Sequence, residues 1–245
     1  MITSQPSETR VRHISVVRPG SPHMAELEKT GCPNLVTDGY DLYTRSFVPG
    51  HSIYGERTVE FEGREYRRWD PRRSKMAAYM LLTGGCGGLA AGDLVIYLGA
   101  STGTTLSHIS DIVTEGEIYA VEVSKRPFRD LMDNCSDRAN IIPILGDARD
   151  SMILDGMVSR ADYLYVDIAQ RDQVPIFVDY MERFSCREGM LMLKCRSIDV
   201  AERPSSVAKV ARRYIEERNL AVASETDLDR YEKDHFAFHV KGRDL

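Results

Sequence analysis

Residues 94–105 read LVIYLGASTGTT, and this stretch decides the fold. Its apolar first half, LVIYL (94–98), is typical of a strand that is buried on both faces. The glycines of GASTG (99–103) allow the backbone to turn tightly and to approach a ligand. Thr104 and Thr105 then open a segment whose apolar residues recur at helical spacing. A strand, a glycine turn and a helix in this order predict the first unit of a doubly wound α/β sheet.

Strands and helices alternate strictly after this unit, which favours a mostly parallel sheet covered by helices. The further expected strands are residues 117–122, 140–147, 162–167 and 190–194. Two strand-like runs, 221–228 and 234–240, then follow one another directly and predict an antiparallel hairpin at the sheet edge. We therefore expect an α/β, Rossmann-like fold. The residues expected on the buried faces of its helices are Leu106, Ile109, Val113, Phe128, Leu131, Met132, Cys135, Val174, Phe177, Met181, Phe184, Val207, Val210, Ala211 and Tyr214.

Short alternating segments separated by turn signals at 38–39 and 62–63 precede the large sheet and predict a small β unit. Asp70 and Pro71 then predict the N-cap and first residue of a helix. The glycine-rich residues 83–93 predict the end of that helix and a loop, and not a phosphate-binding turn. The expected division is an N-terminal extension over 1–30, a small β domain over 31–70 and the Rossmann-like domain over 71–245.

The bulk composition limits the class of protein. The chain has 245 residues, 42% of them hydrophobic, which suffices for one sizeable core and a small accessory unit. No apolar run approaches the roughly 20 residues of a membrane span, and the first residues lack the apolar centre of a secretory signal. The five cysteines are scattered, odd in number and form no C-x-x-C pair. We therefore expect an intracellular, cytoplasmic protein without membrane contact, with reduced cysteines and with neither a disulfide framework nor a metal site.

A local basic patch stands out against the overall negative charge. The net charge of −5 argues against binding of RNA by bulk electrostatics, since phosphates attract Lys and Arg. Any RNA contact must therefore come from such a patch or from partners. A solvated basic turn is the alternative interpretation. The patch consists of Arg64, Arg67, Arg68, Arg72, Arg73 and Lys75, against only Glu65 and Asp70.

Acidic residues at successive strand ends predict a pocket for an adenosine cofactor. Glu122 ends the second strand, where a carboxylate accepts hydrogen bonds from ribose hydroxyls. Asp147 ends the third strand within reach of an adenine amino group, and Ala148 leaves room for the base. The free N–H groups of Thr104 and Thr105 favour a carboxylate. The loop lacks G-x-G-x-x-G, so S-adenosylmethionine fits better than NAD; a plain strand–helix turn is the structural alternative.

An acid and two amines are expected beside this pocket. Asp167 ends the fourth strand, Lys194 ends the fifth, and Lys75 opens the helix that precedes the sheet. Because buried charges must be paired, a structural ion pair between Asp167 and Lys194 is one interpretation. The functional interpretation places the pair where a nucleophile meets a methyl donor. His235, in the last hairpin, is either a fourth member of this set or a core histidine.

The chain resembles fibrillarin-type proteins over nearly its whole length after about Leu35. The glycine-arginine-rich tail of eukaryotic members is absent, which resembles the archaeal branch. Ser101 and Thr102 depart from the usual Ala-Ser of the glycine loop, and Val123 stands where an aromatic residue commonly stacks near the cofactor. The motifs that carry the resemblance are TDGYDLYTRSFVPGHSIYGE, EYRRWDPRRSKMAA, VIYLGASTGTTLSHISDIV, IYAVEVSKRPFRDL, IIPILGDAR, VDIAQRDQ, MLMLKCRSID and YEKDHF.

The resemblance implies a small N-terminal β domain, a methyltransferase domain and 2′-O-methylation of ribosomal or transfer RNA. It implies a box C/D guide-RNA particle with a Nop5-type scaffold and an L7Ae-type RNA-binding protein. Its catalytic set falls on Lys75, Asp167, Lys194 and His235. We expect Arg72, Arg73 and Arg196 to contact RNA. The S-adenosyl-L-methionine positions are expected at Gly99, Ala100, Gly103, Thr104, Thr105, Glu122, Val123, Asp147, Ala148, Asp167 and Gln170.

Two other classes of function stay open at this point. A NAD-dependent oxidoreductase would use a similar sheet, although the missing G-x-G-x-x-G counts against it. A ribonucleoprotein scaffold without catalysis would retain the fold, although the complete set of acid, two lysines and histidine counts against it. Methylation of a protein, for instance on a glutamine, would suit the same pocket.

Overall fold

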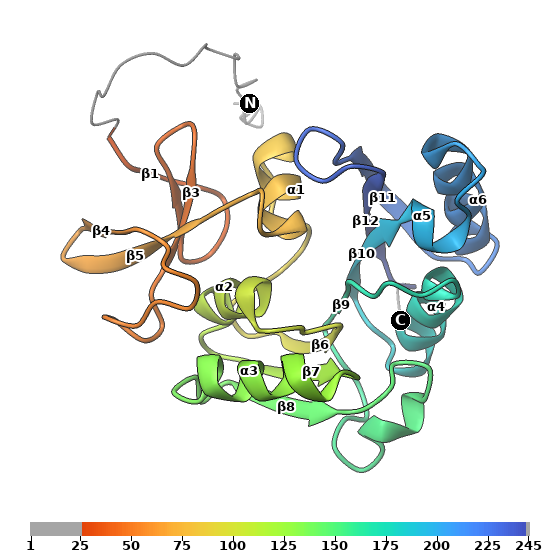
Figure 1. Ribbon diagram of the computed structural model, residues 1–245, viewed down its shortest axis with the longest axis horizontal. Helices are drawn as coiled ribbons and strands as arrows, with labels where there is room; N and C mark the ends of the chain where they lie inside the picture. Colours follow the sequence, from red (N-terminus) through yellow and green to blue (C-terminus); the bar gives the residue numbers. More distant parts are fainter. Residues whose placement is uncertain (1–25, 244–245) are drawn as a thin grey trace, which may run out of the picture.

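Two sheets organise the molecule in the computed structural model, which describes residues 26–243 (Figure 1). The expected N-terminal extension therefore lies mostly outside the described residues. Its last residues, 26–30, are described and include β1 (Glu28–Lys29), which pairs with the next strand and so belongs to the first sheet. This antiparallel sheet has the order β1-β2-β3-β5-β4, with β2 (Leu35–Thr37), β3 (Leu42–Arg45), β4 (Thr58–Phe61) and β5 (Arg64–Trp69).

The large sheet has the order β11-β12-β10-β9-β6-β7-β8. Strands β10, β9, β6, β7 and β8 run parallel to one another. Strand β12 pairs antiparallel with both β10 and β11, which confirms the Rossmann-like sheet and its terminal hairpin. The strands are β6 (Leu94–Leu98), β7 (Glu117–Glu122), β8 (Ile141–Leu145), β9 (Tyr163–Val166), β10 (Glu188–Lys194), β11 (Ala221–Asp227) and β12 (His235–Lys241).

Helices cover both faces of the large sheet. One core contains residues of α4 and α6, and a second contains residues of α1, α2 and α3 (Figure 1). Between β6 and β9 the strand order reverses, and in open α/β sheets ligands bind at that point, beyond the carboxyl ends of the strands. The helices are α1 (Lys75–Thr83), α2 (Thr104–Ile112), α3 (Lys125–Cys135), η1 (Ser151–Leu154), α4 (Gln173–Arg183), α5 (Cys195–Ile198) and α6 (Pro204–Glu216).

Two expected core positions are wrong. Val210 of α6 is 66% exposed and Met132 of α3 is 45% exposed. The buried stripe of α3 is narrower than its apolar pattern and consists of Leu131 and Cys135. On α6 the buried stripe is shifted by about one residue and runs through Ala208 and Ile215.

Helix α1 begins later than the Asp70–Pro71 signal predicts. Its N-cap is Ser74, whose Oγ accepts a hydrogen bond from the Ala77 N–H. Asp70 instead accepts from the N–H of Arg72 and closes a turn before the helix. The predicted end of the helix is confirmed, since Gly84 follows it in the left-handed conformation.

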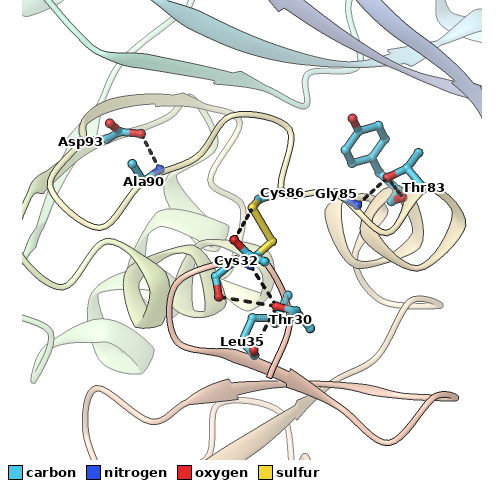
Figure 2. The surroundings of a disulfide bond; sticks show 10 residues. Thr30, Cys32, Leu35, Thr83, Gly85, Cys86, Ala90 and Asp93 are labelled. Carbon is cyan, nitrogen blue, oxygen red and sulfur yellow. Dashed lines mark hydrogen bonds between the residues drawn. A yellow bond between two sulfur atoms is a disulfide. The ribbon is translucent and has the colours of Figure 1, made fainter. Parts of the chain in front are cut away.

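A disulfide joins Cys32, beside the first sheet, to Cys86, in the loop that follows α1 (Figure 2). The expectation of reduced cysteines without a disulfide is therefore wrong for this pair. The two residues are 54 positions apart in the sequence, with Cα atoms 5.5 Å apart, so only the tertiary fold brings them together. Thr30 fixes one side, because its Oγ1 accepts from the Cys32 N–H and donates to the Leu35 carbonyl.

Replacing Cys86 by serine should destabilise the protein by about 2–4 kcal/mol, because an unfolded chain without the cross-link regains loop entropy. Urea denaturation of the oxidised and reduced protein measures this. Cys186→Ala is the matched control, since Cys186 is a free, buried cysteine. Addition of reductant should lower the urea midpoint of the parent protein and of the control, but leave the urea midpoint of Cys86→Ser unchanged. A urea midpoint of the parent protein that does not change with reductant would contradict the prediction.

Candidate active site

A cavity of about 340 Å³ lies at the carboxyl ends of β6, β7 and β9, where the strand order reverses. It is lined by six of the expected cofactor residues: Gly99, Glu122, Val123, Ala148, Asp167 and Gln170. The other five expected positions do not line it: Ala100, Gly103, Thr104, Thr105 and Asp147.

The two glycines of the loop have different roles. A Cβ on Gly99 would lie 2.2 Å from the Asp167 carbonyl oxygen, so only glycine lets β6 pass the end of β9. Gly103 is the N-cap of α2 with a φ of 91° and offers no side-chain acceptor. The first N–H groups of α2, including those of Thr104 and Thr105, are therefore left to bind a carboxylate from a ligand.

Glu122 is held rigidly at the end of β7. It is 8% exposed, and its two oxygens accept hydrogen bonds from the Ser101 and Ser124 N–H groups, each at 2.8 Å. A carboxylate oxygen has a second lone pair, so both can still accept from ribose hydroxyls. Across the cavity the side-chain oxygen of Gln170 is buried without a hydrogen-bond partner within residues 26–243. A ligand donor would satisfy it, so the residues present fit an adenosine-bearing cofactor.

Asp147 and Val123 fit the cofactor less directly. The side chain of Asp147 pairs with Arg149 at 2.6 Å, and hydrogen bonds from Arg149 lower the pKa of Asp147 to about 2. This carboxylate must release Arg149, whose side chain is 63% exposed, before it can reach an adenine amino group. Val123 is 53% exposed and offers a small apolar surface at the edge of the cavity.

Asp167 pairs with Lys75 rather than with Lys194. The Lys75 Nζ lies 2.9 and 2.8 Å from the two carboxylate oxygens of Asp167, and both side chains are about one-fifth exposed. The alternative of an Asp167–Lys194 ion pair is therefore wrong: helix α1 starts over the end of β9 and delivers its first residue there. Within the described part of the chain no carboxylate lies at ion-pair distance from Lys194.

His235 lies next to Lys194 across the β10–β12 ladder, where the two residues are direct partners. It is 5% exposed, and its Nδ1 lies 2.7 Å from the Lys233 carbonyl oxygen. Burial lowers the pKa of His235, and the Lys75 ammonium lowers it further. The imidazole is therefore neutral at pH 7. It is a buried histidine, and it also borders the charged groups of the site.

Ser74 is a site residue that the sequence did not single out. It caps α1 immediately before Lys75, and its Oγ accepts a hydrogen bond from Thr105 Oγ1 at 3.1 Å. It therefore links the start of α2 to the start of α1. A serine just before an apolar helical run is an N-cap signal, and that signal could have identified it.

The basic patch is smaller than expected. Arg67 is fully buried between β5 and α2, and Arg68 pairs with Asp41, so neither is free for RNA. Their partners lie far away in the sequence, which is why charge counting missed the pairing. Arg72 and Arg73 are exposed beside Lys75, as expected. Arg196 is half-exposed, but its side chain pairs with Asp234 at 3.0 Å and donates to the Val200 carbonyl.

Comparison with known proteins decides the family. The sequence profile named Fibrillarin matches residues 32–244. This chain belongs to the fibrillarin family. A fibrillarin-like rRNA/tRNA 2′-O-methyltransferase of Methanothermobacter thermautotrophicus is 45% identical over 87% of this chain and 96% of that protein.

Two solved structures of the fibrillarin family have the same fold. Aeropyrum pernix fibrillarin with natively bound S-adenosyl-L-methionine is 37% identical, with a TM-score of 0.75 over 89% of this chain and 100% of that one. A fibrillarin in complex with Nop5p is 39% identical, with a TM-score of 0.79 over 88% of this chain and 100% of that one. The Rossmann-like fold with an N-terminal antiparallel sheet is thus the fold of the family.

Proposed function

We propose that this chain transfers a methyl group from S-adenosyl-L-methionine to ribose 2′-hydroxyls of rRNA or tRNA, directed by box C/D guide RNA. One observation carries the proposal: Asp167 lines the cofactor cavity and at the same time holds the Lys75 ammonium. An acid flanked by an amine at the mouth of an adenosine-type cavity suits deprotonation of a hydroxyl beside a methyl donor. The names of the relatives support this choice of reaction and substrate.

The bound cofactor supplies a methyl group on a sulfonium, which is already a good leaving group. Glu122 binds its ribose hydroxyls, the N-terminus of α2 binds its carboxylate, and Gln170 accepts a hydrogen bond from it. The protein therefore has to position the reactants and help the hydroxyl lose its proton.

The charged cluster performs that second task. Asp167 orients the 2′-hydroxyl or accepts its proton at a carboxylate oxygen. Lys75 and Lys194 stabilise the negative charge that develops on the ribose oxygen. His235, neutral because it is buried, orients the ribose or a lysine.

Replacing Glu122 by alanine should weaken binding of S-adenosylmethionine about tenfold to hundredfold, because hydrogen bonds to a charged acceptor are lost. Calorimetry with the pure protein measures this. Glu117→Ala is the matched control, since Glu117 begins the same strand, is exposed and accepts only from Tyr119 within the described residues. Equal affinities of the two variants would show that Glu122 does not bind the cofactor.

RNA and partner proteins complete the proposed enzyme. Arg72 and Arg73 contact phosphates around the target nucleotide, with Arg196 near the end of β10. Because the chain carries a net charge of −5, a Nop5-type scaffold and an L7Ae-type protein bring the RNA, and guide pairing selects the site. A solved fibrillarin/Nop5p complex supports the scaffold.

Within residues 26–243, no helix is apolar over enough length to cross a bilayer. We propose a small β domain over 31–70, to whose sheet β1 (Glu28–Lys29) adds one strand, and a methyltransferase domain over 71–245.

Radiolabelled methyl transfer to a guide-matched RNA tests the proposal. The complete complex should label one ribose, and this chain alone should label little. Calorimetry with NAD and with S-adenosylmethionine accompanies the assay. Binding of NAD in place of S-adenosylmethionine would indicate an oxidoreductase, and binding of the methyl donor without transfer would indicate a scaffold; either result rejects the proposal.

A further inference from the structure

A fully buried amide connects Lys194 to the wall of the cofactor cavity. Gln173 is the first residue of α4 and is 0% exposed. Its Oε1 accepts a hydrogen bond from the Lys194 backbone N–H at 2.8 Å. Its Nε2 donates to the Lys194 carbonyl at 3.2 Å and to the Gln170 carbonyl at 2.8 Å. One side chain therefore fixes the backbone of a proposed catalytic residue and of a cavity-lining residue.

The location of this amide explains why it is needed. The parallel pairing of β9 with β10 ends at Val166 and Leu191, three residues before Lys194. Beyond that point the residues after β9 line the cavity. The backbone of Lys194 therefore has no hydrogen-bond partner from β9. Buried backbone N–H and C=O groups need hydrogen bonds. The side-chain amide of Gln173 offers one donor group and one acceptor, as a peptide unit does, and it continues the ladder to Lys194.

We propose that Gln173 is a positioning residue that sets the Lys194 ammonium relative to the methyl donor. It does so by tying the end of β10 to the cavity-lining loop at Gln170, and it touches neither cofactor nor RNA. The inference rests on the proposed methyl transfer and adds a residue to that site.

Gln173→Met keeps the length of the side chain and removes all three hydrogen bonds. In the guide-RNA complex it should lower kcat about 100-fold, since misplacement of a reacting group by about 1 Å has that effect. The affinity for S-adenosylmethionine and the KM for RNA should change little. Asn140→Leu is the matched control, because Asn140 is a buried amide that donates to the Ser110 and Val113 carbonyls beside the start of β8. It should lower stability but leave the kcat of the folded enzyme unchanged.

Gln173→Glu separates positioning from stability. Its carboxylate still accepts from the Lys194 N–H but offers no donor to the two carbonyls. Protonation restores one donor, and burial favours the neutral form. The kcat of this variant should therefore recover as the pH falls, while that of Gln173→Met should not, at temperatures where circular dichroism shows both folded. A kcat of Gln173→Met equal to that of Asn140→Leu, or parallel pH profiles for Gln173→Glu and wild type, would overturn the inference.

A measurement without RNA keeps this test separate from the proposed function. The rate at which an amine-acylating reagent modifies Lys194, read by mass spectrometry, should change severalfold in Gln173→Met and not in Asn140→Leu. If wild type methylates no RNA but this change occurs, the proposed function fails and the positioning role stands. If wild type methylates RNA and both the acylation rate and kcat are unaffected by Gln173→Met, only the positioning role fails.

Discussion

Lys194→Ala should abolish guided methyl transfer and leave binding of S-adenosylmethionine nearly unchanged. Lys194 lies at the end of β10 beside His235, outside the residues that line the cofactor cavity. Its ammonium has no carboxylate partner within residues 26–243, so its charge is available to the ribose oxygen. Loss of one donor to a developing oxyanion typically costs about 100- to 1,000-fold in kcat.

Single-turnover methyl transfer in the assembled complex measures this effect, and calorimetry measures cofactor affinity. Lys209→Ala is the matched control, since Lys209 is an exposed lysine on α6. It should retain the wild-type rate. Unchanged turnover in Lys194→Ala would remove Lys194 from the catalytic set. A parallel loss of cofactor affinity would mean that it acts in binding and not on the nucleophile.

The sequence could predict the parts of the site that follow directly from strands. An apolar run that ends in a carboxylate places that carboxylate at the carboxyl end of a parallel strand, which is how Glu122 and Asp167 were found. Both line the cavity. The same logic fails for Asp147, because its pairing with Arg149 is a local choice of side-chain conformation that no periodicity encodes.

Contacts between segments distant in the chain could not be predicted from the sequence. Lys75 is 92 residues from Asp167. Whether Asp167 pairs with Lys75 or with Lys194 therefore depends on where α1 packs on the sheet. The disulfide and the burial of Arg67 depend in the same way on how the first sheet packs against α2 and the loop after α1. Gln173 was also missed, because a polar residue at the first position of a helix usually lies in solvent, and only the gap beside β10 turns it inward.

The second large effect concerns stability: Asp111→Ala should cost about 3–5 kcal/mol, because within the described residues it removes the one carboxylate paired with buried Arg138 and leaves buried Arg67 with Glu56 alone. Asp111 is 0% exposed and lies 2.8 Å from Arg67 and 2.7 Å from Arg138. It also accepts hydrogen bonds from Thr44 Oγ1 and the Phe47 N–H. Thr44, Phe47 and Arg67 belong to the N-terminal part and Asp111 belongs to α2, so this one carboxylate joins the first sheet to helix α2.

Urea denaturation measures the loss, with Asp133→Ala as control, since Asp133 is an exposed aspartate on α3. Neighbouring His108 adds no charge, because burial, together with Arg67 and Arg138, holds its pKa well below its ordinary value. Asp111→Asn should fall between parent and alanine variant, since it keeps the shape and loses the charge. A loss no larger than that of Asp133→Ala would mean that apolar packing alone holds the sheets together. The expected loss would instead show that Asp111 holds β5 against α2. Since β5 leads to Lys75, the same contact would also help to place Lys75.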